Sequence, residues 1–374
     1  GAASRRKPRI FFYLLTKRLS TLDGQTYDLY NPRLVDTLGR DRFILYQDNA
    51  DDPRKVYAPD ILRTDLLPLF AITLFLVRLL LGRQIDAFAR RISALYPQLG
   101  FSSADASGMV SRFTAQYWAY RFLLRILAPK EVIMLCNYMR EAFTAACSSR
   151  GLRTTELMHG NITLGHAYYH IPPAYATPEG RSLLPDRVVV YGQYWKDVLV
   201  QGNFMPAGQI GVVGYFLQVP QPAEKDRSGR KMVLITSQYT VQEELLAYAA
   251  FLKRSLDPRE WEIVIKPHPA EDAAPFRALE QPGFVSVVTE NTYALMQRAH
   301  VHISVYSTTI FEAARYGVSN WALNVPKYAD RWQEYVDTGI CRLLQPDQLP
   351  DASPLDQEQV YYYFSEYDPN ALFA

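Results

Sequence analysis

Short apolar runs alternate with longer amphipathic segments in the first half of the chain, as expected for strands followed by helices. The predicted strands lie at 10–15, 43–47, 131–136, 154–159 and 187–191. The predicted helices lie at 66–97, 107–128, 140–150 and 195–199. Strands that alternate with helices form a parallel sheet with helices on both faces. The first half is therefore predicted to be a doubly wound α/β domain.

The second half repeats this pattern more regularly. Its predicted strands lie at 232–236, 261–266, 284–288, 301–306 and 321–325. Its predicted helices lie at 241–256, 272–280, 291–299 and 308–316. A tyrosine-rich segment at 355–366 predicts a last helix that packs back across the first domain. We expect a second doubly wound domain with five parallel strands.

The chain length and a polar stretch near its middle predict two domains. A chain of 374 residues exceeds the size of one average core. Pro220, Pro222 and the charged run 224–230 have the composition of a linker. The expected division is an N-terminal domain at 1–210, a C-terminal domain at 211–350 and a returning tail at 351–374. Two such domains face each other across a cleft at the carboxyl ends of their strands.

One stretch, Leu66–Val77, is apolar almost throughout and has two interpretations. Only 12 residues separate Asp65 from Arg78, whereas a membrane-spanning helix needs about 20. The favoured interpretation is a buried helix, because the packing of the fold alone explains it. The alternative is an apolar surface that rests against a membrane. The basic residues close to that surface would be Arg78, Arg83, Arg90 and Arg91.

Composition narrows the classes of partner and compartment. The chain has 48% hydrophobic and 21% charged residues, which is typical of a globular protein, and its formal charge of +2 argues against nucleic-acid binding. Cys136, Cys147 and Cys341 are widely spaced, so neither a disulfide framework nor a zinc site is indicated. The apolar run 10–15 is too short for the core of a signal peptide. We expect a cytoplasmic protein, with peripheral contact to the inner face of the cytoplasmic membrane under the second interpretation above.

Candidate chemistry in the second half follows the predicted strand 261–266. Lys266 and His268 alternate with two prolines, which fix the backbone of the loop. The imidazole of His268 can donate a hydrogen bond to a phosphate oxygen, and Lys266 can add positive charge there. A rigid loop with a purely structural histidine is the alternative.

Three consecutive hydroxyls, Ser307-Thr308-Thr309, follow the predicted strand 301–306. One of them can cap the next helix while the others and the free amide groups face an anion. Capping without a ligand is the alternative. Glu312, one turn further, is expected to point into the cleft, where its carboxylate can accept hydrogen bonds from ribose hydroxyls; a solvated helix residue is the alternative. Ser237 and Gln238, after the strand 232–236, are expected to line the same pocket.

The order and spacing of His268, Ser307-Thr308 and Glu312-Ala-x-x-x-Gly317 resemble the HP and SS/ST motifs of GT-B glycosyltransferases. The pattern is most similar to bacterial transferases that use cytidine nucleotides, such as sialyltransferases, Kdo transferases and polyol-phosphate transferases of the teichoic-acid type. The resemblance covers residues 232–325. It implies phosphate contacts from His268, Ser307 and Thr308, and a ribose contact from Glu312.

Three histidines cluster in the first half, after the predicted strand 154–159. His159 precedes Gly160 in a loop and is expected to point into the cleft. Glu156 is three positions earlier, so on a strand the two side chains would face opposite sides. Either side chain can serve as the general base for an acceptor hydroxyl. His159, His166 and His170 can instead be metal ligands or simply structural. Because Pro172 and Pro173 follow and the chain has no D-x-D element, we expect no metal site.

Together these features predict a metal-independent GT-B glycosyltransferase without a cofactor. The resemblance implies a CMP-activated donor, such as Kdo or a sialic-acid-like sugar, and a cell-surface glycan acceptor of lipopolysaccharide or capsule. The expected partners are a nucleotide sugar and a glycan or lipid-linked oligosaccharide. Four alternatives remain: a CDP-polyol phosphotransferase, a UDP-sugar transferase, an epimerase and a noncatalytic nucleotide-sugar-binding protein.

Overall fold

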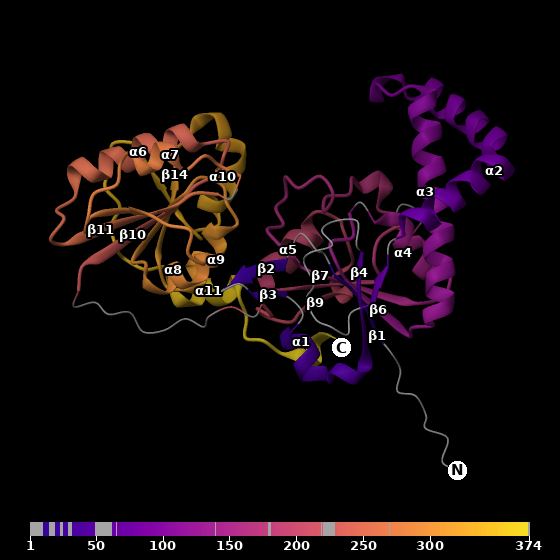
Figure 1. Ribbon diagram of the computed structural model, residues 1–374, viewed down its shortest axis with the longest axis horizontal. Helices are drawn as coiled ribbons and strands as arrows, with labels where there is room; N and C mark the ends of the chain where they lie inside the picture. The colour runs from indigo at the N-terminus through magenta and orange to yellow at the C-terminus, as the bar shows by residue number, and fades with distance from the viewer. Residues whose placement is uncertain are drawn as a thin grey trace, which may run out of the picture.

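The computed structural model contains two α/β domains, each built around its own sheet (Figure 1). It describes residues 10–14, 19–22, 25–28, 32–48, 62–64, 66–138, 140–178, 181–217, 219, 229–268 and 270–372. Most of the predicted linker at 220–230 lies outside the described residues.

The N-terminal sheet has seven parallel strands in the order β5-β4-β1-β6-β7-β8-β9. They are β1 (Ile10–Leu14), β4 (Phe43–Asp48), β5 (Leu62–Thr64), β6 (Glu131–Leu135), β7 (Arg153–Leu157), β8 (Arg187–Val190) and β9 (Ile210–Val212). The helices α1 (Pro32–Leu38), α4 (Glu141–Ser148) and α5 (Gln193–Gln201) belong to this domain. β5, β9 and an antiparallel ribbon of β2 (Leu19–Leu22) and β3 (Gln25–Asp28) are additions to the prediction.

The C-terminal sheet has six parallel strands in the order β12-β11-β10-β13-β14-β15. They are β10 (Lys231–Thr236), β11 (Trp261–Lys266), β12 (Val285–Val287), β13 (Val301–Ser304), β14 (Ser319–Leu323) and β15 (Arg342–Leu344). The helices are α6 (Gln242–Ser255), α7 (Ala274–Arg277), α8 (Thr292–Arg298), α9 (Thr309–Arg315) and α10 (Ala329–Asp337). β15 is the sixth strand, where five were expected.

The central strands of both sheets are buried on both faces because helices cover both faces. All residues of β13 and β14 are buried, as are five of the six in β10. Both sheets reverse their strand order at one point, between β1 and β6 and between β10 and β13. Ligands bind α/β sheets at such a point, beyond the carboxyl ends of the strands.

The C-terminal tail returns to the N-terminal domain through α11 (Gln357–Tyr363), which packs against α5 and α9. The indole Nε1 of Trp195 donates to the carbonyl oxygen of Tyr363 at 3.0 Å. A Cβ at Gly192 would lie 2.2 Å from that same oxygen, so only glycine permits this close approach. The tail therefore ties α5 of the first domain to α9 of the second.

Two long helices, α2 (Leu67–Leu95) and α3 (Ser103–Leu127), form an antiparallel pair that extends beyond the N-terminal sheet at the upper right of Figure 1. We call residues 67–127 the arm. The favoured prediction, a buried helix at 66–77, is wrong, because several of its large apolar side chains are exposed: Leu67, Ile72, Phe75 and Leu76. The run was apolar on every side, so the sequence pattern did not indicate which face packs.

The helix also continues past Arg78, where the sequence predicted that the apolar stretch would end. Over an 18-residue window α2 has a mean hydropathy of 1.6, and 22% of that window is buried. Among the described residues, α2 is the one helix long and apolar enough to cross a membrane, by length and composition only. The 12-residue limit expected for this stretch therefore does not hold.

Candidate functional site

Three loops carry the predicted donor-binding residues to one edge of the C-terminal sheet. Lys266 is the last residue of β11 and His268 follows it. Ser237 and Gln238 follow β10, and Ser307 and Thr308 lie between β13 and α9. β10 is hydrogen-bonded to β11 on one side and to β13 on the other. Neighbouring strands lie about 4.8 Å apart, so the outer two of these loops start within about 10 Å of each other. The strand order thus brings these residues together at the switch point.

Glu271 joins the first two loops, a role that no sequence argument assigned to it. Its carboxylate accepts a hydrogen bond from the Ser237 hydroxyl at 2.7 Å and from the backbone N–H of His268 at 2.5 Å. The Nδ1 of exposed His268 accepts from the backbone N–H of Ala270 at 3.1 Å. A neutral imidazole that accepts at Nδ1 carries its proton on Nε2. His268 is therefore oriented as an Nε2–H donor.

The third loop is tied through its backbone to the loop that follows β10. Gln238 Oε1 accepts from the backbone N–H of Tyr306 at 3.2 Å. The Ser307 hydroxyl accepts from the backbone N–H of Thr309 at 3.3 Å, while Thr308 is exposed and its side chain makes no capping bond. Local bonds therefore position the loop and leave the Thr308 hydroxyl at the surface.

A buried network of polar side chains lies behind this edge of the sheet. His302 Nε2 and the Thr236 hydroxyl are 2.8 Å apart, and His302 Nδ1 and Asn320 Oδ1 are also 2.8 Å apart. The Thr236 hydroxyl also contacts that of Thr309, the first residue of α9, at 2.9 Å. Burial lowers the pKa of His302 to about 4, so the imidazole is neutral at pH 7. The chain fixes the start of α9 against β10, β13 and β14.

Lys266 and Glu312 are half-buried on either flank of these loops. Lys266 Nζ donates to the carbonyl oxygen of Thr289 at 3.5 Å, and burial lowers the pKa of its ammonium group. The Glu312 carboxylate accepts a hydrogen bond from the Tyr293 hydroxyl on α8 at 2.8 Å. The carboxylate of Glu312 therefore points from α9 toward Tyr293 on α8.

In the N-terminal domain Glu156 is completely buried on β7. It accepts hydrogen bonds from the backbone N–H of Asn137 at 3.1 Å and from the hydroxyl of Tyr169 at 2.7 Å. Desolvation raises the pKa of this carboxyl to about 7 and outweighs both hydrogen bonds. With no exposed surface, Glu156 does not reach a substrate in this conformation.

His159 lies two residues beyond β7, at the rim of the same region. Its Nε2 is 3.0 Å from the hydroxyl of Tyr138, and the side chain is 6% exposed. Tyr138 also contacts the ring of His166, with centroids 5.7 Å apart. The structure thus brings Glu156 and His159 into one aromatic-lined region, with His159 nearer the surface.

A cavity of about 380 Å³ between the domains links this region to the C-terminal loops. The N-terminal domain contributes the loop after β7, including Asn161 and His166, and the C-terminal domain contributes Tyr306 and α10. Asn161 Nδ2 donates to the Tyr335 hydroxyl at 2.5 Å, and the backbone N–H of Leu164 donates to Glu334 at 3.1 Å. Residue 306, next to the Ser307 and Thr308 hydroxyls, therefore faces the loop that follows His159.

Sequence reasoning missed the contribution of α10 to this cavity. Arg331 stacks over the ring of Tyr306 with 5.0 Å between guanidinium carbon and ring centroid, and Glu334 also accepts from the Tyr194 hydroxyl at 3.3 Å. Burial raises the pKa of Glu334. The sequence offered a signal for this contribution, because Arg331 and Glu334 follow the last strand predicted for the C-terminal sheet.

The three N-terminal histidines do not form a ligand set in this conformation. Within the part of the chain that the structure describes, no group of three or more His, Cys, Asp and Glu side chains is arranged to hold a metal ion. His159 instead contacts Tyr138, and the ring of His166 packs on Tyr169 with centroids 4.9 Å apart.

Similar solved structures exist, although no family model and no curated protein sequence matches the chain. The glycosyltransferase SnogD from Streptomyces nogalater has a TM-score of 0.53 and 15% identity, over 98% of this chain and 93% of that one. A putative UDP-N-acetylglucosamine 2-epimerase from Listeria monocytogenes has a TM-score of 0.53 and 11% identity, over 95% and 86%. The S. aureus MnaA–UDP complex has a TM-score of 0.52 and 10% identity, over 98% and 94%.

These likenesses define the fold class. Each covers most of both chains, so the likeness extends over both domains. With the two switch points described above, they show a two-domain, Rossmann-like GT-B fold. The predicted fold class is thus confirmed. At these identities the likeness concerns the fold and not the reaction.

Proposed function

We propose that the protein is a metal-independent GT-B glycosyltransferase that transfers a sugar from a CMP-activated donor. The donor class is Kdo or a sialic-acid-like sugar, and the acceptor is a bacterial cell-surface glycan of lipopolysaccharide or capsule. One observation carries the proposal: three loops with a histidine, hydroxyls and a lysine lie side by side at the switch point of the C-terminal sheet. Such a point is where α/β sheets bind nucleotides.

In the proposed donor complex, His268 Nε2–H and the hydroxyls of Ser307 and Thr308 donate to the phosphate of the nucleotide. These donors, with the charge of Lys266, stabilise the departing CMP in place of a divalent cation. Glu312 holds the ribose, and Ser237 and Gln238 line the pocket. The orientation of His268 by Ala270 and Glu271 supports this role, because a fixed donor needs no rearrangement when negative charge develops.

The general base in this proposal is His159. Glu156 has no exposed surface, so its part is to hold Tyr169 and the backbone at Asn137 behind His159. Neutral His159 accepts the proton of the acceptor hydroxyl, and the resulting alkoxide attacks the anomeric carbon as the bond to the phosphate breaks. The inter-domain cavity beside His166 and Tyr306 is the proposed place for this encounter.

A UDP-sugar transferase or a UDP-sugar epimerase is the second candidate. The neighbours named as a UDP-N-acetylglucosamine 2-epimerase and as a UDP complex align over 95% and 98% of this chain, respectively. The same phosphate-binding loops serve a monophosphate or a diphosphate, so the nucleotide distinguishes these candidates.

The test is to incubate the protein with a panel of CMP-, CDP- and UDP-linked donors and to identify the nucleotide released. Release of CMP from a CMP-linked sugar, together with calorimetric binding of CMP in preference to CDP and UDP, is the expected result. Release of CMP from a CDP-linked polyol would instead identify a polyol-phosphate transferase. Release or binding of UDP alone supports the second candidate. Interconversion of a UDP-sugar without any acceptor would identify an epimerase. If neither the parent nor His268→Ala bound any nucleotide, both candidate functions would be refuted.

The proposed acceptor places the protein at the inner face of the cytoplasmic membrane. Lipid-linked glycans have their reducing end at the bilayer, so a transferase that extends them works close to it. This location rests on the acceptor class and not on the donor loops.

A further inference from the structure

Exposed apolar side chains are concentrated on the arm. Of the 18 large hydrophobic side chains that are exposed among the described residues, 13 lie between Leu67 and Ile126. Phe75 is 66% exposed, Leu79 68% and Ile126 64%. Single exposed apolar residues are ordinary on a folded protein, whereas a contiguous exposed apolar surface marks an interaction site.

The exposed apolar residues of α2 lie opposite the face with which the helix packs. The buried positions are Thr73, Val77, Gly82, Ile85 and Ala89. The exposed positions Ile72, Phe75, Leu76, Leu79 and Leu80 recur at helical spacing, and we call them the apolar face. The more apolar side of the helix is thus turned outward, the reverse of an ordinary surface helix.

The exposed line of α2 becomes basic beyond the apolar face. Arg83 and Arg90 follow Leu79 by four and eleven residues, so they continue the same side of the helix, and both are exposed. Residues 67–127 contain seven arginines and two aspartates, without lysine or glutamate, which leaves a charge of +5. The whole chain carries only +2. Positive charge is therefore concentrated on the arm together with the apolar surface.

Both aspartates of the arm already have partners. Asp86 accepts from Arg78 at 3.0 Å, and Asp105 accepts from the hydroxyl of Ser102, the residue that caps α3, at 2.7 Å. Within the described residues, neither Arg90 nor Arg112 is in an ion pair. These two guanidinium groups are thus available to an external anion.

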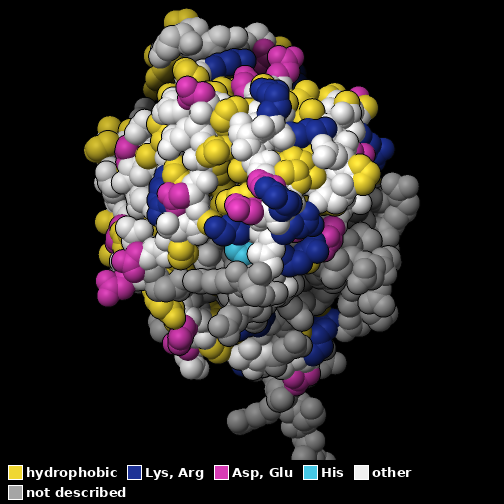
Figure 2. Space-filling view, turned by 90° about the vertical axis from the view of Figure 1, so that its left-hand side faces the viewer, with side chains coloured by type: hydrophobic (Ala, Val, Ile, Leu, Met, Phe, Trp, Pro, Cys, Tyr) yellow, Lys and Arg dark blue, Asp and Glu magenta, His cyan; other side chains and the backbone are white. Residues whose placement is uncertain are grey.

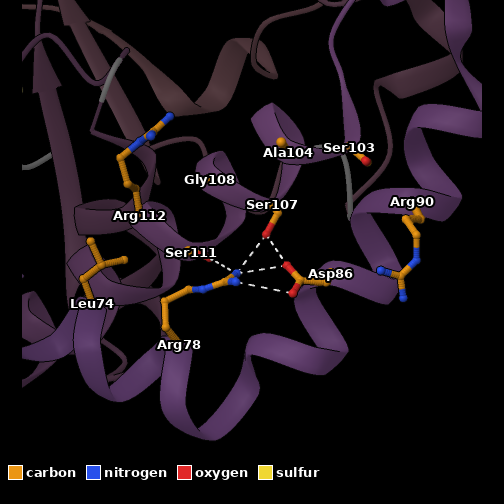
Figure 3. A pocket seen from close by; sticks show the side chains of 10 residues that line it. All are labelled: Leu74, Arg78, Asp86, Arg90, Ser103, Ala104, Ser107, Gly108, Ser111 and Arg112. Carbon is orange, nitrogen blue, oxygen red and sulfur yellow. Dashed lines mark hydrogen bonds and ion pairs between the residues drawn. The ribbon is translucent and has the colours of Figure 1, made fainter.

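A cavity of about 550 Å³ between α2 and α3 collects these groups (Figure 3). At its centre Arg78 bonds Asp86, the Ser107 hydroxyl at 2.9 Å and the Ser111 hydroxyl at 3.3 Å. Arg90 and Arg112 line the same cavity and lie on either side of this group in Figure 3. Arginines and hydroxyls around one opening suit a phosphate group. Arg90 belongs to this cavity and to the exposed line of α2.

We propose that the arm docks on the surface of a bilayer containing anionic phospholipid. The apolar face of α2 enters the boundary between headgroups and acyl chains, and the cavity between Arg90 and Arg112 receives the phosphate of a lipid headgroup. An amphipathic helix with arginines beside its apolar face binds such surfaces through apolar burial and headgroup attraction together. The inference concerns a different surface from the donor loops and does not depend on the donor.

A second copy of the chain fits this surface less well. Two arms that met by their apolar faces would bring their charges of +5 together, and their own aspartates are already used. The face of the C-terminal domain seen in Figure 2, by contrast, has basic and acidic side chains interspersed. An anionic bilayer supplies the negative charge that the arm lacks.

The test is flotation of the whole purified chain with vesicles of phosphatidylcholine, with and without phosphatidylglycerol. We expect binding that requires phosphatidylglycerol and weakens as salt is raised. Arg90→Gln with Arg112→Gln should lower the partition coefficient about 30-fold. Phe75→Ser with Leu79→Ser should lower the partition coefficient tenfold or more, because each substitution loses the free energy of burying an apolar side chain in the bilayer.

Matched controls separate these effects from general surface changes. Arg254→Gln with Arg277→Gln removes two exposed arginines from the C-terminal domain, and Val200→Ser with Leu349→Ser removes two exposed apolar side chains outside the arm. Both should leave vesicle binding unchanged. Nucleotide binding should be the same in all four variants, so failure here is distinct from failure of the proposed function.

Several outcomes would overturn the inference. They are equal binding to neutral and anionic vesicles, equal loss in the control variants, or dimerisation through the apolar face without vesicle binding. Protein that remains in the vesicles after an alkaline carbonate wash would indicate a spanning helix and overturn surface docking. Protection of Arg90 and Arg112 from modification by inorganic phosphate, but not by anionic vesicles, would assign the cavity to a free anion.

Discussion

The two domains have the same strand order around their switch points, yet they differ in the burial of the polar residues near the ends of their strands. In the N-terminal domain Asn137 and Glu156 are completely buried and bonded within the domain. In the C-terminal domain His268 and Thr308 are exposed, and Ser307 is half-buried. The same topology therefore closes off these polar groups in the N-terminal domain, whereas in the C-terminal domain an accessible row of donors lies next to the buried network of His302.

The difference shows that a switch point alone does not define a ligand site. What matters is whether the groups there already bond each other. Asn137 donates to the carbonyl oxygen of Leu183 at 3.0 Å and to the Tyr168 hydroxyl, and it accepts from the Thr144 hydroxyl. In the C-terminal loops Glu271 and the backbone orient the donors, and their outward sides stay accessible. The first arrangement stabilises a domain, and the second suits an anion.

The largest expected effect is on the closed network. Asn137→Ala should lower the free energy of unfolding by about 3 kcal/mol, because several buried partners lose their hydrogen bonds together. Urea denaturation measures this loss. Ser307→Ala, at the accessible row, should change the same quantity by less than about 0.5 kcal/mol. Similar losses in the two variants would contradict the contrast between the domains.

Glu156 should make the N-terminal domain less stable as pH rises. The folded pKa of about 7 lies above the unfolded value of 4.5, so the folded state holds the proton more tightly and stability falls between these values. Glu156→Gln removes this dependence. The parent should lose about 2 kcal/mol of stability between pH 5 and pH 8 that the variant does not lose. The free energy of unfolding of the variant minus that of the parent should therefore rise by this amount over the same range. A pH-independent difference between the two proteins would exclude a buried titrating carboxyl.

His268→Ala should weaken nucleotide binding by about 1–3 kcal/mol, since it removes a charge-assisted hydrogen bond to phosphate. The free energy of unfolding should be unchanged within about 0.5 kcal/mol, because the side chain is exposed. Isothermal calorimetry and urea denaturation measure the two quantities. His170→Ala is the matched control, as His170 is an exposed histidine of the other domain. Unchanged affinity in His268→Ala would remove His268 from the proposed site.

The smallest effect is expected at His302 and has the opposite sign to that of Glu156. Its folded pKa of about 4 lies below the unfolded value of 6.5, so the unfolded state binds the proton more tightly and stability falls as pH falls through this range. His302→Gln removes the dependence. The free energy of unfolding of the parent minus that of the variant should fall by about 1.4 kcal/mol from pH 8 to pH 5.5. A difference that widened instead would show that the imidazole is charged in the folded protein.

Much of the C-terminal sheet could be predicted because its strands are apolar on both faces. Strand 261–266 was predicted with the bounds that the structure shows, and 232–236 differs by one residue at its start. β15 was missed because its three residues, Arg342–Leu344, are too short and mixed to stand out. The side-by-side placement of the loops with His268 and Ser307 followed from this alternation.

The sequence by itself determined the βα alternation, the parallel sheets and the residues that face their common edge, because strand burial is written locally in runs of apolar side chains. Only the tertiary structure decided which polar groups are closed off. Glu156 and His268 both stand near strand ends, yet packing from distant segments buries one and leaves the other exposed. The same holds for α2: its apolar residues were evident, but which face remains without a partner depends on where α3 and the sheet lie.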